Sequence, residues 1–310
     1  MSFSRRAFVK TVGLGGVAAF SGSYIPRAYD LPEFWTAELL AQERPLLLHN
    51  NENPAGPGER ALAAARGVLG ENGEGVGRYP FAEANGLSRA IADRFGVAPA
   101  NVVLGLGSTQ VLRTAVQAYT SPMKPLVTAT PTYEECTQYA ELIGSPFTEI
   151  GLNDKMQLDL NEMAAAAREG AGLVFLNNPN NPTATVHGED AVMAFIDDVL
   201  TGSPDTTILV DEAYHDYVTD ASHRSQISTA LTNPRVIVAR TFSKAHGMAG
   251  MRVGYGIAHE DTVRELMPWH SFNTLNALGI AAGTVSIGDT ARLEAESVRN
   301  TEARQFTIDW

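Results

Sequence analysis

Short, strongly apolar runs alternate with longer amphipathic stretches through the middle of this 310-residue chain. The apolar runs are rich in β-branched and large aliphatic residues, which is typical of strands buried on both faces. These runs cover residues 101–104, 126–130, 173–176, 207–210 and 236–239. Helical patterns fill the intervals at residues 108–119, 133–143, 159–168 and 188–200. Alternation of this kind predicts an α/β fold in which helices cover both faces of a mostly parallel sheet.

The charge balance limits the classes of partner that this chain can bind. It has 23 Lys and Arg residues against 35 Asp and Glu residues, which gives a formal net charge of −12. Nucleic acids and anionic membranes attract surfaces with an excess of positive charge, so we expect neither as a partner. Cys136 is the single cysteine, which excludes an intramolecular disulfide and leaves too few thiolates for a zinc site. The seven histidines form no pair at metal-ligand spacing, and we expect no metal centre.

The first 28 residues have the composition of an export signal. The paired Arg5 and Arg6 precede an apolar run at residues 12–20, which is too short to span a bilayer, and small polar residues follow. This order is typical of a secretory signal, and the paired arginines resemble the twin-arginine type. The alternative is the basic start of an ordinary amphipathic helix. We therefore expect export to the periplasm, or a cytoplasmic location if the alternative holds.

Polar side chains follow directly after two of the predicted strands. Asp211 comes after the run at 207–210, and Tyr214 lies three residues further on. Lys244 lies shortly after the run at 236–239. The carboxyl ends of parallel strands meet at one edge of a sheet, where ligands collect. The sequence therefore predicts that these three side chains share a site.

Two further strand ends supply an amide and an anion-binding segment. The run at 173–176 leads into a stiff turn of asparagines and prolines, which presents Asn181. The run at 101–104 leads into a glycine-rich turn and a helix start, whose backbone N–H groups can hold a phosphate. The candidate residues of this segment are Gly107, Ser108 and Thr109. Arg252 would add a cation able to bind a phosphate through two parallel hydrogen bonds.

These groups are the ones that pyridoxal phosphate requires. Its aldehyde binds an amine covalently, and Lys244 is the candidate nucleophile, activated by desolvation and nearby positive charge. Asp211 is placed to keep the ring nitrogen protonated, so that the ring accepts electrons from a substrate carbanion. Asn181 and Tyr214 are suited to donate hydrogen bonds to the phenolate oxygen of the cofactor, and Tyr133 is suited to stack on its ring. Once a substrate amine has displaced it, the Lys244 amine can carry a proton to and from the substrate.

The combined pattern resembles the fold-type I aminotransferases of class I and II and is most similar to the histidinol-phosphate aminotransferase family. The resemblance runs from about residue 48 to residue 256. It rests on the motifs at 51–57, 78–80, 131–133, 178–183, 211–214, 243–244 and 250–255. It implies an enzyme of amino-acid metabolism or biosynthesis, which moves an amino group between an amino acid, or an amine like histidinol phosphate, and a 2-oxo acid. Two half-reactions on the cofactor would complete the transfer.

The same resemblance implies how the cofactor phosphate is held. Within one subunit, the implied phosphate-binding residues are Ser108, Thr109, Thr241, Ser243 and Arg252. Tyr79 would reach the phosphate in the partner subunit. A homodimer with shared active sites is therefore implied.

The export signal and this resemblance together divide the chain into four regions. They are the signal at 1–28, an N-terminal arm with part of a small domain at 29–52, a large cofactor-binding domain at 53–258, and an interdomain helix with the start of the smaller α+β domain at 259–310. Family members have a further C-terminal segment that supplies an arginine for the substrate's carboxylate or phosphate. We expect this chain to be a fragment of a longer one. Arg292, Arg299 and Arg304 match no such position, so no substrate role is given to them.

Three alternatives remain open. A decarboxylase or lyase of the same fold would use the same substrate carbanion. A chain without the C-terminal segment could bind the cofactor and lack turnover. The glycine-rich turn at 105–110 is close to a dinucleotide fingerprint, but Gln110 replaces its third small residue and no acidic residue follows at the required spacing. An export signal on a biosynthetic enzyme also favours a paralogue with a different amino donor.

Overall fold

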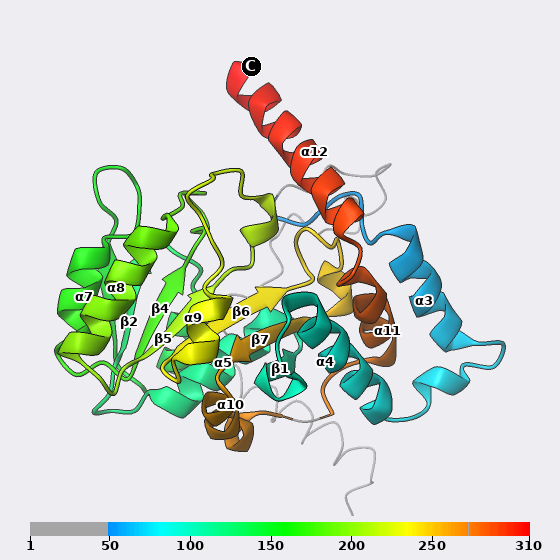
Figure 1. Cartoon of the computed structure of the whole chain (residues 1–310), viewed down its shortest axis with the longest axis horizontal. Coiled ribbons are helices and arrows are strands. Elements are labelled where there is room, and N and C mark those ends of the chain that lie inside the picture. Colours follow the sequence, from blue (N-terminus) through cyan, green and yellow to red (C-terminus); the bar gives the residue numbers. More distant parts are fainter. Residues whose placement is uncertain (1–48, 272) are drawn as a thin grey trace, which may run out of the picture. The chain divides into compact units, whose positions relative to one another are not determined.

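The structure, a computed structural model, describes residues 49–271 and 273–310 (Figure 1). The predicted export signal at 1–28 and the predicted arm as far as residue 48 lie outside the described residues. Residues 51–310 form one compact unit, which contains all the described helices and strands. None of the helices in the described residues has the length and apolar content needed to cross a membrane.

A seven-stranded sheet lies at the centre of the 51–310 unit (Figure 1). Its strands are β1 (Val102–Gly105), β2 (Leu126–Thr130), β3 (Phe147–Gly151), β4 (Leu173–Asn177), β5 (Thr207–Asp211), β6 (Val236–Thr241) and β7 (Gly254–Ala258). The order across the sheet is β1-β7-β6-β5-β4-β2-β3. Among the described strands, β7 alone runs antiparallel to its neighbours β1 and β6. The predicted α/β fold with a mostly parallel sheet is therefore confirmed.

Helices cover both faces of this sheet (Figure 1). They are α3 (Glu59–Leu69), α4 (Phe81–Phe95), α5 (Gly107–Tyr119), α6 (Glu135–Leu142), α7 (Leu160–Ala167), α8 (Glu189–Gly202), α9 (Ile227–Thr232), α10 (Glu260–Leu266), α11 (Ala277–Ser286) and α12 (Thr290–Asp309). Successive residues of a strand point to opposite faces. In β4, Val174 and Leu176 pack in one core cluster with α4, α7 and α8, whereas Leu173 and Phe175 pack in another with α5, α6 and α10.

Apolar runs predicted five of the seven strands, and β3 and β7 were missed. β3 lies at the edge of the sheet, where Phe147, Thr148 and Glu149 are all exposed, so it lacks a continuous apolar run. β7 is fully buried, but Gly254 and Gly256 interrupt its apolar pattern, and glycine weakens a strand signal.

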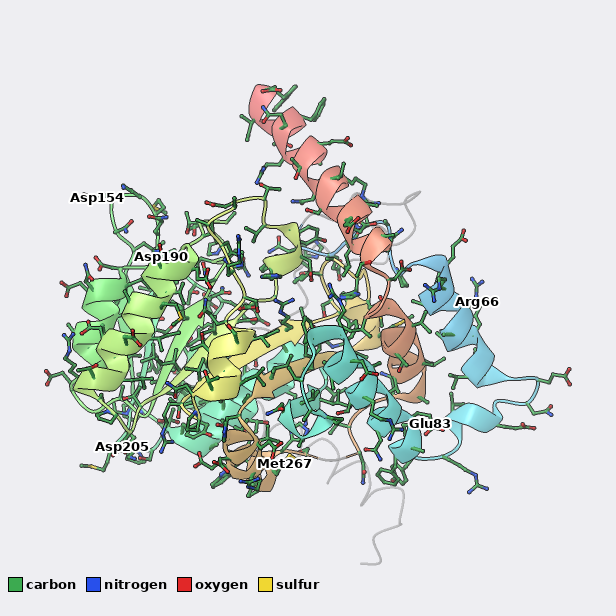
Figure 2. All side chains as sticks on the ribbon, in the orientation of Figure 1. Arg66, Glu83, Asp154, Asp190, Asp205 and Met267 are labelled. Atoms are coloured by element: carbon green, nitrogen blue, oxygen red, sulfur yellow. The ribbon has the colours of Figure 1, made fainter. Side chains whose placement is uncertain are left out.

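The outer surface of the unit is charged, as its acidic composition requires. Side chains such as Glu83, Asp154 and Asp190 lie on the outside (Figure 2). The sheet ends at Ala258, where the predicted large domain also ends. However, residues 51–310 form one compact unit, in which α11 packs against α3 and α4. The predicted boundaries at 52/53 and 258/259 stay predictions.

Candidate active site

A buried carboxylate closes the carboxyl end of β5. Asp211 is the last residue of that strand and is 1% exposed. Its Oδ1 accepts a hydrogen bond from the backbone N–H of Ala213 at 3.1 Å. Burial raises the pKa of Asp211 to about 7; the Ala213 N–H opposes this rise, the adjacent Glu212 adds to it and Lys244 opposes it. A carboxylate in such a setting can pair with a cationic N–H group that is buried with it.

An amine reaches the same edge of the sheet from the neighbouring strand. Lys244 lies three residues after β6, which pairs with β5 in parallel. Its Nζ donates a hydrogen bond to the backbone oxygen of Asn51 at 3.2 Å and lies 5.5 Å from the centroid of the Tyr214 ring. Burial lowers the pKa of Lys244; Glu52 and Asp211 oppose this change and the Arg252 charge adds to it. A lowered pKa leaves more of the amine in its neutral, nucleophilic form.

Asn181 and Tyr214 are brought together beside this amine. The Nδ2 of Asn51 donates to Asn181 Oδ1 at 3.4 Å and to the Tyr214 hydroxyl oxygen at 3.3 Å. From the sequence alone, Asn51 is part of the family motif at 51–57 and has no predicted role of its own. Its left-handed backbone, with φ of 53°, is one that asparagine adopts more readily than most other residues.

A candidate anion site lies where the start of α5 meets Arg252. The guanidinium donates from Nη2 to the backbone oxygen of Leu106 at 3.4 Å and from Nη1 to Ser243 Oγ at 3.3 Å. The Ser243 backbone N–H donates in turn to Thr241 Oγ1 at 3.1 Å. The first N–H groups of α5 carry a partial positive charge, as at any helix N-terminus. Backbone N–H groups, two hydroxyls and a guanidinium therefore converge on one small region, which suits a phosphate.

Two glycines allow the close packing around this candidate anion site. A Cβ added to Gly107, whose φ is 69°, would lie 2.6 Å from Arg252 Nη2. A Cβ added to Gly254 of β7 would lie 2.2 Å from the carbonyl carbon of Gly107. Because only glycine avoids both clashes, these two positions let Arg252 and β7 pack closely against the start of α5.

Tyr133 contacts this candidate anion site, whereas Tyr79 does not. Tyr133 follows β2, and its hydroxyl is hydrogen-bonded to the side chain of Thr109. Burial, aided by the nearby charge of Glu135, raises the pKa of Tyr133 to about 12, so the phenol stays neutral. Tyr79 is 70% exposed, and its ring contacts Phe81, with 5.8 Å between ring centroids. Its predicted reach into a partner subunit, like the predicted cofactor roles of the other residues, stays a prediction.

A cavity of about 660 Å³ lies beside Tyr214 and is lined on one side by residues of α12. It shares Asn51, Asn181 and Tyr214 with the group around Lys244. On its α12 side, the buried Glu296 accepts a hydrogen bond from the Asn53 side chain. It also forms ion pairs with Arg292 and Arg299. Such a cavity has the size of a small-molecule site.

Comparison with known proteins identifies relatives over most of the chain. A family model described as aminotransferase class I and II matches residues 43–308. Histidinol-phosphate aminotransferase of Symbiobacterium thermophilum is 34% identical over 259 residues, which are 84% of this chain and 69% of that protein. Its counterpart in Moorella thermoacetica is 33% identical over 260 residues, which are 84% of this chain and 65% of that protein. The chain spans about two thirds of the length of these curated relatives.

Solved structures share the architecture. Histidinol-phosphate aminotransferase from Sinorhizobium meliloti, in complex with pyridoxal-5'-phosphate, has a TM-score of 0.79 at 28% identity and covers 92% of this chain and 76% of that one. A tetra mutant of aspartate aminotransferase from Thermus thermophilus, at 20% identity, has a TM-score of 0.74 and covers 88% of this chain and 77% of that one. The likeness to the second protein is one of fold.

Proposed function

Because the chain belongs to the class I and II aminotransferase family, we propose that it moves an amino group between an amino acid, or an amine like histidinol phosphate, and a 2-oxo acid. The enzymes of this family are pyridoxal-phosphate-dependent transaminases, and pyridoxal phosphate is the cofactor. The observation that carries the proposal is that Lys244, the buried Asp211 and the candidate anion site at Arg252 meet at one edge of the sheet.

The described residues fit this cofactor. The buried Asp211 would pair with the ring nitrogen, and the candidate anion site of Arg252 and α5 would hold the phosphate. Asn181 and Tyr214 would donate to the phenolate oxygen. When bound, the cofactor supplies a ring that withdraws electrons from the substrate α-carbon.

Lys244 has two tasks in this proposal. Its Nζ would bind the cofactor aldehyde, and the lowered pKa of Lys244 favours the neutral amine that this binding needs. After a substrate amine has taken its place, the same Nζ takes the proton from the substrate α-carbon. Asp211 would hold its negative charge next to the ring nitrogen, and Arg252 would hold the phosphate. The amino group is then passed to a 2-oxo acid in a second half-reaction.

The substrate, assembly and location are parts of the same proposal. The names of the relatives support an amine that carries a phosphate. A homodimer is supported by the exposed aromatic pair Tyr79 and Phe81, since such pairs are common on subunit contact surfaces. The paired arginines in residues 1–28 support twin-arginine export to the periplasm.

The test combines covalent labelling and absorbance spectroscopy on the purified full chain loaded with pyridoxal phosphate. Reduction with borohydride followed by peptide mapping should label Lys244. The Lys244→Ala variant should lose the label, and Lys155→Ala, which changes an exposed lysine, should keep it. Addition of amino acids or histidinol phosphate should change the absorbance band, and a 2-oxo acid should restore it. A label on another lysine, or none, would overturn the proposal. Release of carbon dioxide without use of a 2-oxo acid would favour a decarboxylase instead.

A further inference from the structure

Asn51 contacts three of the residues that would hold the cofactor. Its side-chain amide donates to Asn181 and to Tyr214, and its backbone oxygen accepts from Lys244 Nζ. We propose that Asn51 is a positioning residue, which aims the hydrogen-bond donors of Asn181 and Tyr214 at the phenolate oxygen of the cofactor. This inference rests on the proposed function.

Each hydrogen bond of the Asn51 side chain has a fixed direction. The Nδ2 of Asn51 has two hydrogens and accepts no hydrogen bond, so it must donate to both partners. Asn181 therefore accepts through Oδ1, and its own Nδ2 is held on the opposite side of the amide group. Tyr214 also accepts through its oxygen, so its hydroxyl hydrogen has to be directed at a different acceptor. One amide on the 51–54 segment thereby fixes the orientation of two donors that lie 130 and 163 residues away in the chain.

The backbone of Asn51 contributes separately. With φ of 53°, it lies in the left-handed region, where asparagine and glycine are tolerated and most other residues are strained. Glycine can therefore keep the backbone path and the contact of the carbonyl oxygen with Lys244, while removing the side-chain amide. Alanine also removes the amide, but it disfavours the left-handed backbone conformation at position 51. The pair Asn51→Gly and Asn51→Ala separates the two contributions.

The readout is the pH at which the absorbance band of the Lys244-bound cofactor changes. Donors to the phenolate oxygen stabilise its negative charge and therefore lower this transition pH. If Asn51 aims those donors, Asn51→Gly should raise the transition pH by about one unit. Asn51→Ala should raise it at least as far. A transition pH for Asn51→Gly that equals that of the unchanged chain would overturn the inference.

A double-mutant cycle tests whether Asn51 acts through Tyr214. Tyr214→Phe removes the donor that Asn51 would orient, so Asn51→Gly should shift the transition pH less in that variant than in the unchanged chain. Fully additive shifts would show that Asn51 acts independently and would overturn the role given to it. Failure of the proposed function looks different, because the unchanged chain would then show no band from a Lys244-bound cofactor at all.

Discussion

At the scale of single residues, burial gives Asp211 an unusual titration. The pKa of its carboxyl rises from an ordinary value of 3.8 to about 7 in the folded chain, with burial as the largest cause. Between these two values the folded chain holds a proton that the unfolded chain has released. Raising the pH through this interval therefore destabilises the cofactor-free fold, and the loss is complete above about pH 7.

Asp211→Asn should remove this pH dependence, because the amide has nearly the same shape and does not titrate. From about pH 4 to about pH 7, the cofactor-free unchanged chain should lose a few kcal/mol of unfolding free energy relative to the variant. Urea unfolding of both proteins across this interval measures the difference. Two curves that run parallel would mean that Asp211 is ionised in the fold.

The candidate site was predictable to the extent that its residues follow strands. Asp211 and Lys244 come directly or shortly after apolar runs, and parallel strands must bring them to one edge. Asn51 has no such local signal. Its contacts with Asn181, Tyr214 and Lys244 join positions that are 130 to 193 residues apart, so only the folded chain reveals them.

At the scale of elements, β7 is held against the start of α5 by the absence of a side chain. Gly254→Ala would place a Cβ 2.2 Å from the Gly107 carbonyl carbon and 2.3 Å from the Ser108 nitrogen. Because backbone atoms cannot rotate away, β7 and the start of α5 must separate. We expect a loss of about 1–3 kcal/mol in stability. The affinity for pyridoxal phosphate should also fall, as measured by equilibrium titration.

Gly151→Ala is the matched control. Gly151 ends the edge strand β3, and an added Cβ there has no atom within 4 Å. This variant should keep both the stability and the cofactor affinity of the unchanged chain. If Gly254→Ala behaved like this control, the close approach of β7 to α5 would have no role in the candidate anion site.

A buried ion pair joins the ends of β5 and β6. Arg240 donates from Nε and Nη2 to Glu212 Oε2 at 3.0 and 2.7 Å, and Ser225 and the Gln226 backbone N–H complete the coordination of this carboxylate. Arg240→Met would leave the Glu212 charge buried without its partner. We expect the free energy of unfolding to fall by about 3–5 kcal/mol, as measured by chemical denaturation.

The cause of that loss can be tested in the same background. Adding Glu212→Gln to Arg240→Met should recover part of the stability, since the uncompensated charge is gone. The exposed pair of Arg168 and Asp198 is the reference, because Arg168→Ala should cost less than about 1 kcal/mol. No recovery in the double variant would point to packing rather than to charge.

The strands that apolar runs identify are those buried on both faces, such as β4, β5 and β6. β3 was not predicted because it lies at the edge of the sheet. That position depends on the order of all the strands, which a short stretch of sequence does not reveal. β7 was not predicted because its sequence contains Gly254, which is required by a tertiary contact, the close approach of β7 to Gly107. The pattern of the chain therefore predicts the strands that carry continuous apolar runs, whereas the exposed edge strand β3 and the glycine-containing β7 are seen only in the folded chain.

At the scale of the whole molecule, the proposed homodimer divides each active site between two chains. Lys244 and Arg252 meet within one chain, whereas Tyr79 is 70% exposed and contacts Phe81. If Tyr79 completes the site of a partner subunit, a defect in Tyr79 and a defect in Lys244 belong to different sites of the same dimer.

Mixing two inactive variants tests this division. Tyr79→Ala and Lys244→Ala chains, each of low activity alone, should regain activity after they are unfolded together and refolded. In a hybrid dimer, one site receives both intact residues and the other receives neither. Random pairing would make roughly a quarter of all sites intact, so transaminase activity should approach that share of the unchanged enzyme. If Tyr79 acts within its own chain, every site in the mixture carries one of the two defects. Activity would then stay at the level of the separate variants, and the shared site would have to be abandoned.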